Sequence, residues 1–98
     1  MNKDQYQNIF KKARELINQN SLINLRDYRS RGFYYGEFYH DFVILKTKVS
    51  MGSVRKDSCQ CQTFEKYGAC EHTMALRTEV GLPISWEDAY VELHDEEN

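Results

Sequence analysis

The sequence predicts a small α+β domain with an N-terminal helix, an antiparallel hairpin or three-stranded sheet, and two short helices after it. An amphipathic segment lies near the N-terminus, an aromatic and β-branched stretch covers residues 33–49, and helical spacing returns from residue 71. The chain has 98 residues and no internal repeat, so we expect a single domain spanning residues 1–98. A domain this small buries only about 60–65% of its unfolded surface.

The first predicted element is an amphipathic helix over residues 4–18. Its apolar side chains recur at helical spacing and are Tyr6, Ile9, Phe10, Ala13, Leu16 and Ile17. Asp4 is a candidate N-cap, and a polar run over residues 18–21 marks the end of the helix. We expect this helix to pack on the rest of the domain, and a helix that binds a partner is the alternative.

The central part of the chain predicts β-structure. Residues 22–29 predict a short strand and residues 29–32 a turn, and residues 33–49 predict strands at about 33–39 and 42–49 with His40 and Asp41 between them. Alternate residues of a strand face opposite sides, so one of two sets is expected to fill the core. The sets are Phe33, Tyr35, Glu37 and Tyr39, and Tyr34, Phe38 and His40. The alternation over residues 46–49 suits an exposed edge, and a third strand is expected over residues 58–62.

Two helices are predicted after the strands. Residues 71–80 carry an apolar helical pattern that ends at Gly81, with Pro83 just beyond. A capping-box-like sequence at residues 85–88 then opens a short helix that leads into an acidic tail over residues 85–98.

Three cysteines and a histidine lie together between these elements, as Cys59-Gln-Cys61 and Cys70-Glu-His72. Three thiols and an imidazole are a complete tetrahedral ligand set for one structural zinc ion. Two residues i and i+2 of a strand face the same side, and the eight residues after Cys61 can loop back through a turn at Gly68. Cys70 and His72 can both chelate if Cys70 precedes the helix and His72 lies in its first turn. The alternative is three buried free thiols beside a solvent-facing His72.

The same residues argue against catalysis. Four protein ligands close the site and leave no position for an activated water. The chain contains no phosphate-binding glycine-rich loop and no HExxH motif, and no cysteine is left over for a thiol-dependent enzyme. His40 and His94 are expected to be solvated. We therefore expect a protein that is not an enzyme.

Cys-x-Cys on a strand followed by Cys-x-His at the start of a helix resembles the SWIM-type zinc finger. The resemblance runs from about residue 42 to residue 81, within an expected zinc-binding core at 33–81, and all four ligand positions match. It implies a structural zinc domain used for DNA binding or protein contact, in a family whose members usually belong to larger enzymes. This chain departs from the family at the residue between Cys70 and His72, which is often basic in relatives and is Glu71 here. An acidic residue at the start of a helix suits the helix dipole but would repel a phosphate there.

The charge distribution favours nucleic-acid binding by the N-terminal part. Residues 1–58 contain 11 Lys and Arg against 6 Asp and Glu, and residues 59–98 contain 2 against 9. Single-strand binders combine cations with stacking rings, so we expect single-stranded rather than double-stranded DNA. The candidate contacts are Arg26, Arg29, Arg31, Tyr34, Tyr35, Lys46, Lys48, Arg55 and Lys56. A hairpin with one aromatic face in the core and tyrosine hydroxyls at the surface is the plain structural alternative.

A protein partner is the second expectation. Residues 79–98 contain seven acids and no Lys or Arg, with Trp86, Tyr90 and Leu93 at helical spacing. This segment could dock on a basic polymerase, helicase or recombinase, or on the basic half of its own domain. We expect a non-catalytic zinc-binding adaptor for a DNA transaction such as replication, recombination or mobile-element mobility. A purely protein–protein interaction subunit without direct DNA binding is the alternative.

No apolar stretch approaches the roughly 20 residues that span a bilayer. The first residues also lack the apolar region of a secretory signal. Three cysteines, two of them separated by one residue, do not suggest a disulfide framework. We therefore expect a cytoplasmic protein without membrane contact.

Overall fold

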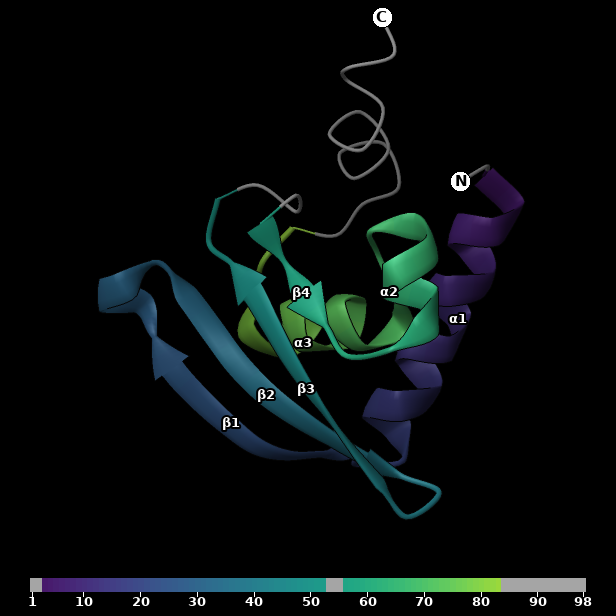
Figure 1. Cartoon of the computed structure of the whole chain (residues 1–98), viewed down its shortest axis with the longest axis horizontal. Coiled ribbons are helices and arrows are strands. Elements are labelled where there is room, and N and C mark those ends of the chain that lie inside the picture. Colours follow the sequence, from purple (N-terminus) through teal and green to yellow (C-terminus); the bar gives the residue numbers. More distant parts are fainter. Residues whose placement is uncertain (1–2, 53–55, 84–98) are drawn as a thin grey trace, which may run out of the picture.

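The computed structural model describes residues 3–52 and 56–83 of the chain. A four-stranded antiparallel sheet carries its helices on one face, so the fold is α+β as predicted (Figure 1). The elements in chain order are α1 (Lys3–Asn18), β1 (Leu22–Tyr28), the 3₁₀ helix η1 (Arg29–Arg31), β2 (Phe33–His40), β3 (Val43–Ser50), β4 (Ser58–Cys59), α2 (Gln62–Tyr67) and α3 (Glu71–Val80).

Helix α1 confirms the amphipathic pattern. Its apolar stripe, Tyr6, Ile9, Ala13 and Leu16, is buried, and the helix packs mainly against α3. The predicted packing on the domain is therefore confirmed. Asp4, however, lies in the first turn of a helix that already includes Lys3, so it is not the N-cap. Its carboxylate still favours the positive end of the helix dipole there.

The sheet has the order β1-β2-β3-β4, with antiparallel pairing throughout. The expected hairpin or three-stranded sheet gains a fourth strand, because β1 pairs with β2 along most of its length. Strand β3 lies inside the sheet, between β2 and the two-residue β4. The prediction that residues 46–49 form an exposed edge is therefore wrong.

The turn between β2 and β3 lies one residue later than predicted. His40 is the last residue of β2 and pairs with Val43, so Asp41 and Phe42 alone make the turn. Both have positive φ, 52° and 63°. Two-residue hairpin loops favour this left-handed backbone because it matches the twist of the strands.

The core lies between α3 and the inner face of the sheet. Phe38 and Val49 of the sheet and Ala75 and Leu76 of α3 are at most 1% exposed. Tyr34 packs against the same cluster, so the set that contains Tyr34 and Phe38 fills the core. The two alternating faces of β2 were predicted correctly.

Helix α2 was not predicted. The expected strand over residues 58–62 ends at Cys59, and residues 62–67 form a helix where a loop was expected. Cys61 has an extended backbone and caps the helix, since its sulfur accepts a hydrogen bond from the Phe64 amide. Gly68, at φ 73°, ends it, which confirms the predicted turn at that glycine.

Helix α3 begins and ends where the sequence predicted. Cys70 is its N-cap in a capping box with Thr73, and Gly81 at φ 79° follows its last residue. The expected C-terminal helix and tail over residues 85–98 lie outside the described residues.

A buried ion pair fixes α3 to the strands that lead into the cysteines. The Arg77 guanidinium donates to both carboxylate oxygens of Asp57, at 2.7 and 2.8 Å, and to the Ser50 carbonyl at 3.0 Å. The Asp57 carboxylate also accepts from the Ser50 amide at 2.8 Å. A bidentate pair of this kind fixes the position of α3 relative to the end of β3 and the residue that precedes β4.

Candidate metal centre

The four predicted metal ligands converge on one point in the structure. The sulfurs of Cys59, Cys61 and Cys70 and a ring nitrogen of His72 all lie within 4.8 Å of one another. They come from the end of β4, the cap of α2, and the cap and first turn of α3. Among residues 3–52 and 56–83, this is the only such group of three or more potential ligands.

Cys59 and Cys61 meet differently from the way the sequence suggested. They do not share a strand, because β4 ends at Cys59. Cys61 nevertheless keeps an extended backbone, with φ −127° and ψ 159°, before the chain turns into α2. The i, i+2 relation therefore still directs both sulfurs to one side.

Cys70 and His72 are placed as predicted. Cys70 is wholly buried with an extended backbone, and His72 is 3% exposed in the first turn of α3. The distance from the Cys70 sulfur to Nδ1 of His72 is 3.8 Å. The Thr73 amide donates to that sulfur at 3.4 Å, and the helix dipole favours a thiolate there.

The donor groups shift one another's pKa values when no metal is bound. Hydrogen bonds from Cys59 and then from Cys70 hold the pKa of Cys61 far below its ordinary value. Burial, followed by the neighbouring thiols, raises the pKa of Cys70. Burial alone would lower the pKa of His72, but hydrogen bonds to Cys59 and Cys61 outweigh it and raise the pKa to about 9. The cluster thus stabilises one anion and one imidazolium at neutral pH.

The geometry fits a four-coordinate ion. With metal–sulfur and metal–nitrogen bonds of about 2.3 and 2.0–2.1 Å, neighbouring donors of a tetrahedron lie about 3.4–3.8 Å apart. A sulfur–nitrogen pair of such a tetrahedron lies at about 3.6 Å, so the 3.8 Å between the Cys70 sulfur and Nδ1 of His72 is about 0.2 Å longer than an ion would require. Small shifts would bring the remaining atoms, within 4.8 Å, onto the ion. Three thiolates and an imidazole suit a borderline-soft divalent ion.

Two sheet residues that the sequence did not indicate as part of the site border the candidate ligands. The Thr47 hydroxyl lies 3.2 Å from the Cys59 sulfur, and Nε2 of His40 lies 3.2 Å from Nε2 of His72. The expectation that His40 is solvated holds only in part, since 39% of its side chain is exposed while its Nε2 contacts His72. The strand alternation that places His40 on the same face as Phe38 was the available signal.

The candidate nucleic-acid contacts are divided among several places. Four of them, Arg26, Tyr35, Lys46 and Lys48, lie on the solvent side of the sheet, because Tyr35 pairs with Arg26 and Lys48 and the next outward pair joins Glu37 to Lys46. Tyr34 lies on the opposite side, against the core. Arg29 is ion-paired with Asp27 at 2.9 Å, and Arg55 lies outside the described residues, as do the candidate partner contacts Trp86, Tyr90 and Leu93.

We call this solvent side the outer face, consisting of Asn24, Arg26, Tyr28, Phe33, Tyr35, Glu37, Tyr39, Ile44, Lys46 and Lys48. The Lys48 ammonium lies 4.2 Å from the centre of the Phe33 ring, and that ring lies 5.1 Å from the ring of Tyr28. A hydrogen bond from Asn24 and another from Tyr35 lower the pKa of Glu37. The outer face therefore presents three cationic side chains, several aromatic rings, and one carboxylate, that of Glu37, which accepts hydrogen bonds from its neighbours.

A groove extends the outer face toward η1. It has a volume of about 360 Å³ and is lined by Arg31, Gly32, Phe33, Lys48, Ser50, Met51, Gly52 and Lys56. Its charged side chains are all cationic, and two of them, Arg31 and Lys56, are further candidate contacts. A groove of this composition favours an anionic ligand.

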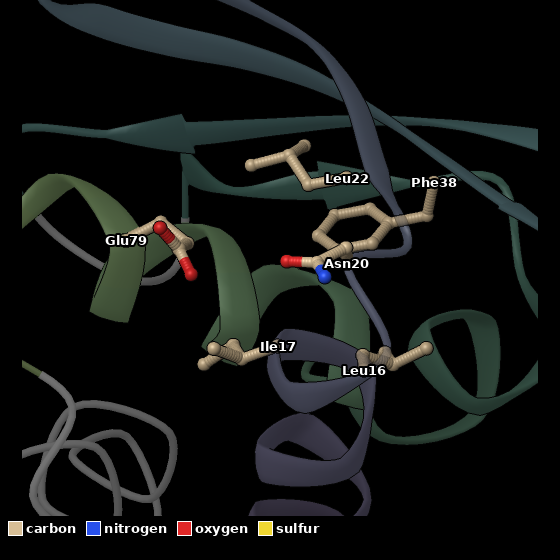
Figure 2. A pocket seen from close by; sticks show the side chains of 6 residues that line it. All are labelled: Leu16, Ile17, Asn20, Leu22, Phe38 and Glu79. Atoms are coloured by element: carbon tan, nitrogen blue, oxygen red, sulfur yellow. The ribbon is translucent and has the colours of Figure 1, made fainter.

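A smaller cavity lies where α1 ends (Figure 2). It has a volume of about 110 Å³ and is lined by Leu16, Ile17, Asn20, Leu22, Phe38 and Glu79. Ligand pockets usually measure about 300–1,000 Å³. We assign no ligand to this cavity.

No helix within the described ranges has both the length and the apolar character needed to cross a membrane. Comparison with known protein families, with curated proteins and with solved structures gives no match for this chain.

Proposed function

We propose that this chain is a non-catalytic zinc-binding module that holds single-stranded nucleic acid, DNA in the first instance, on its outer face. The module would serve a larger DNA-processing enzyme such as a polymerase, helicase or recombinase. The observation that carries the proposal is the row of rings and cations on the outer face, which no other described element covers.

Zinc is the ion that best suits the four ligands. Cys59, Cys61, Cys70 and His72 form the Cys₃His set of structural zinc sites, and the spacing and secondary structure resemble the SWIM-type zinc finger. Such a set leaves no coordination position for water, which supports a structural rather than a hydrolytic ion.

The outer face suits a single strand because it offers both kinds of contact that such a strand needs. Tyr35 and Tyr39 project from alternate positions of β2, where bases can stack on them. Arg26, Lys46 and Lys48 lie on the flanking strands, where they can meet phosphates. The start of α3 is a poorer site, since Glu71 stands beside it.

The basic groove extends the proposed path of the nucleic-acid strand beyond the outer face. Lys48 belongs both to the outer face and to the groove, so a backbone that leaves the face can pass to Arg31 and Lys56. Phosphate contacts at these cations would add affinity without sequence preference.

The protein-only alternative is favoured by a different observation. The turn end of the β2–β3 hairpin exposes four large apolar side chains, namely Tyr39 (44%), Phe42 (94%), Val43 (49%) and Ile44 (50%). Contiguous exposed apolar residues mark protein contacts. In the adaptor, Phe42 and Val43, which lie outside the outer face, would meet the enzyme while the outer face holds the nucleic-acid strand.

The proposal is tested by fluorescence anisotropy of a labelled oligothymidine of about 15 nucleotides, measured over a range of salt concentrations. We expect Tyr35→Ala to weaken binding about tenfold or more, because it removes a stacking ring. Lys46→Ala should reduce the magnitude of the salt slope by about 0.7, because one phosphate contact is lost.

The matched controls are an exposed cation and an exposed ring away from the proposed strand path. Lys11→Ala on α1 and Phe42→Asn in the hairpin turn should leave affinity and slope close to those of the unaltered protein. Binding without a salt slope, or a Tyr35→Ala variant that binds as well as the controls, would overturn nucleic-acid binding and leave the protein-only alternative.

A further inference from the structure

His40 reaches the metal centre from a strand that supplies no ligand. It is the last residue of β2, on the inner side of the sheet with Phe38. Its ring is nearly parallel to the His72 ring, at an interplanar angle of 15°, and the two rings meet edge to edge with their centroids 5.4 Å apart. The two Nε2 atoms lie 3.2 Å apart, which is hydrogen-bond distance.

The two nitrogens of His72 have different surroundings. Nδ1 lies 3.8 Å from the Cys70 sulfur and is therefore the nitrogen directed at the ion. Nε2 is directed at His40. A nitrogen that binds a metal carries no proton, so Nε2 of a metal-bound neutral imidazole must carry it and donate.

His40 is arranged to accept that proton. A neutral imidazole that accepts through Nε2 carries its own proton on Nδ1. Nδ1 of His40 faces the Asp41 carboxylate at 3.6 Å, which favours a proton there. The hydrogen bond therefore has one consistent direction. Nε2–H of His72 donates to Nε2 of His40, whose own N–H, on Nδ1, faces the Asp41 carboxylate.

We propose that His40 is a positioning residue of the metal centre, accepting the Nε2–H hydrogen bond of His72 and thereby holding Nδ1 toward the three thiolates. Metal-binding histidines generally donate their second N–H to an acceptor, most often a carboxylate, a backbone carbonyl or water, and loss of that acceptor lowers metal affinity or activity about 10- to 100-fold. His40 thereby joins the hairpin end of the sheet to a site whose ligands lie on β4, at the N-caps of α2 and α3, and in the first turn of α3.

The need for such a partner follows from the surroundings of His72. The imidazoles of His40 and His72 border a cleft of about 300 Å³, also lined by Lys12, Glu15, Leu16, Gln19 and Glu71. The Glu71 carboxylate lies 3.5 Å from Nδ1 of His72 and attracts a proton to the nitrogen that must bind the ion. A fixed acceptor at Nε2 opposes that tautomer.

The experiment measures the zinc dissociation constant of the full chain by competition with a chromophoric chelator. We expect His40→Ala to bind zinc at least about tenfold more weakly. His40→Gln, whose amide oxygen can accept, should recover most of the affinity. Val43→Ala, at the position paired with His40, is the matched control and should bind like the unaltered protein.

A second readout needs no substitution. In the zinc-loaded protein, long-range ¹H–¹⁵N spectra should show Nε2 of His72 protonated and Nε2 of His40 unprotonated. Zinc on Nε2 of His72, or an affinity of His40→Ala equal to that of the control, would overturn the proposal. The inference rests on the zinc part of the proposed function, and failure of the unaltered protein to bind zinc would instead overturn the metal centre itself.

Discussion

Cys70 caps helix α3 and is also a candidate metal ligand. Its sulfur is directed at the ligand cluster while it also accepts the Thr73 amide at 3.4 Å as the N-cap of α3. The local sequence could predict both, because a cap and an i+2 ligand depend only on neighbours along the chain. The contact between Cys59 and Thr47, which lies 12 residues earlier in the chain, depends on the pairing of β3 with β4. Local sequence could not predict it.

The two functions of Cys70 can be separated by two substitutions. Cys70→Ser and Cys70→Ala should both lose stoichiometric zinc binding, because a thiolate ligand is gone. In excess chelator, the serine variant should unfold with a free energy about 1 kcal/mol higher, since serine caps a helix and alanine does not. Urea unfolding followed by circular dichroism measures the difference. Equal stabilities would show that the cap contributes nothing.

At the scale of elements, the approach of α3 to the sheet depends on a glycine. A Cβ added at Gly36 of β2 would lie 2.8 Å from Cδ1 of Leu22 and 3.0 Å from Cδ1 of Leu76. Both neighbours belong to the packed interior, and Leu76 is fully buried. The glycine therefore sets the distance between β2 and the helix that carries His72.

Gly36→Ala should lower the free energy of unfolding by about 1–3 kcal/mol, the usual cost of overpacking a core. The matched control is Gly52→Ala, where the added Cβ would lie 3.6 Å from the Ser50 hydroxyl in ordinary contact. We expect the control to change stability by no more than about 0.5 kcal/mol. Denaturant unfolding of the zinc-loaded proteins measures both. A Gly36→Ala variant as stable as the control would contradict the close packing.

Helices α1 and α3 were predictable from their apolar residues at helical spacing, and the end of α3 also from Gly81, because these signals lie close together in the sequence. Helix α2 was not, since its six residues bury no side chain and carry no periodic signal. The extent of the sheet also escaped prediction. Weak alternation in β1 gives no sign that it pairs with β2, because pairing is a long-range contact.

At the scale of the whole molecule, the metal should link stability to pH. Without metal, the pKa of His72 is raised to about 9, so its contribution to stability is complete below its ordinary value of about 6.5 and is lost as pH rises through 9. Cys70, whose pKa is also raised, keeps its proton through neutral pH. Zinc must displace both protons when it binds.

We therefore expect the rise in Tm on zinc binding to increase between pH 6 and pH 8.5, as displacement of the protons becomes easier. Thermal unfolding with equimolar zinc and with excess chelator, at several pH values, measures this difference. In the metal-free protein the loss at His72 is opposed by Cys61, whose lowered pKa makes its contribution grow with pH, so stability should change little over the same interval. A zinc-dependent rise in Tm that falls as pH increases would contradict the assignment of His72 and Cys70 as ligands.

The sequence by itself determined the four candidate metal ligands, the limits of α3 and the two alternating faces of β2. These depend on spacing within a few residues, where backbone geometry alone decides direction. Only the tertiary structure decided which face is solvent-exposed, because that depends on where α3 packs. It also placed His40, 32 residues from His72 in the chain, beside that ligand, since only strand pairing and the packing of α3 bring the two rings together.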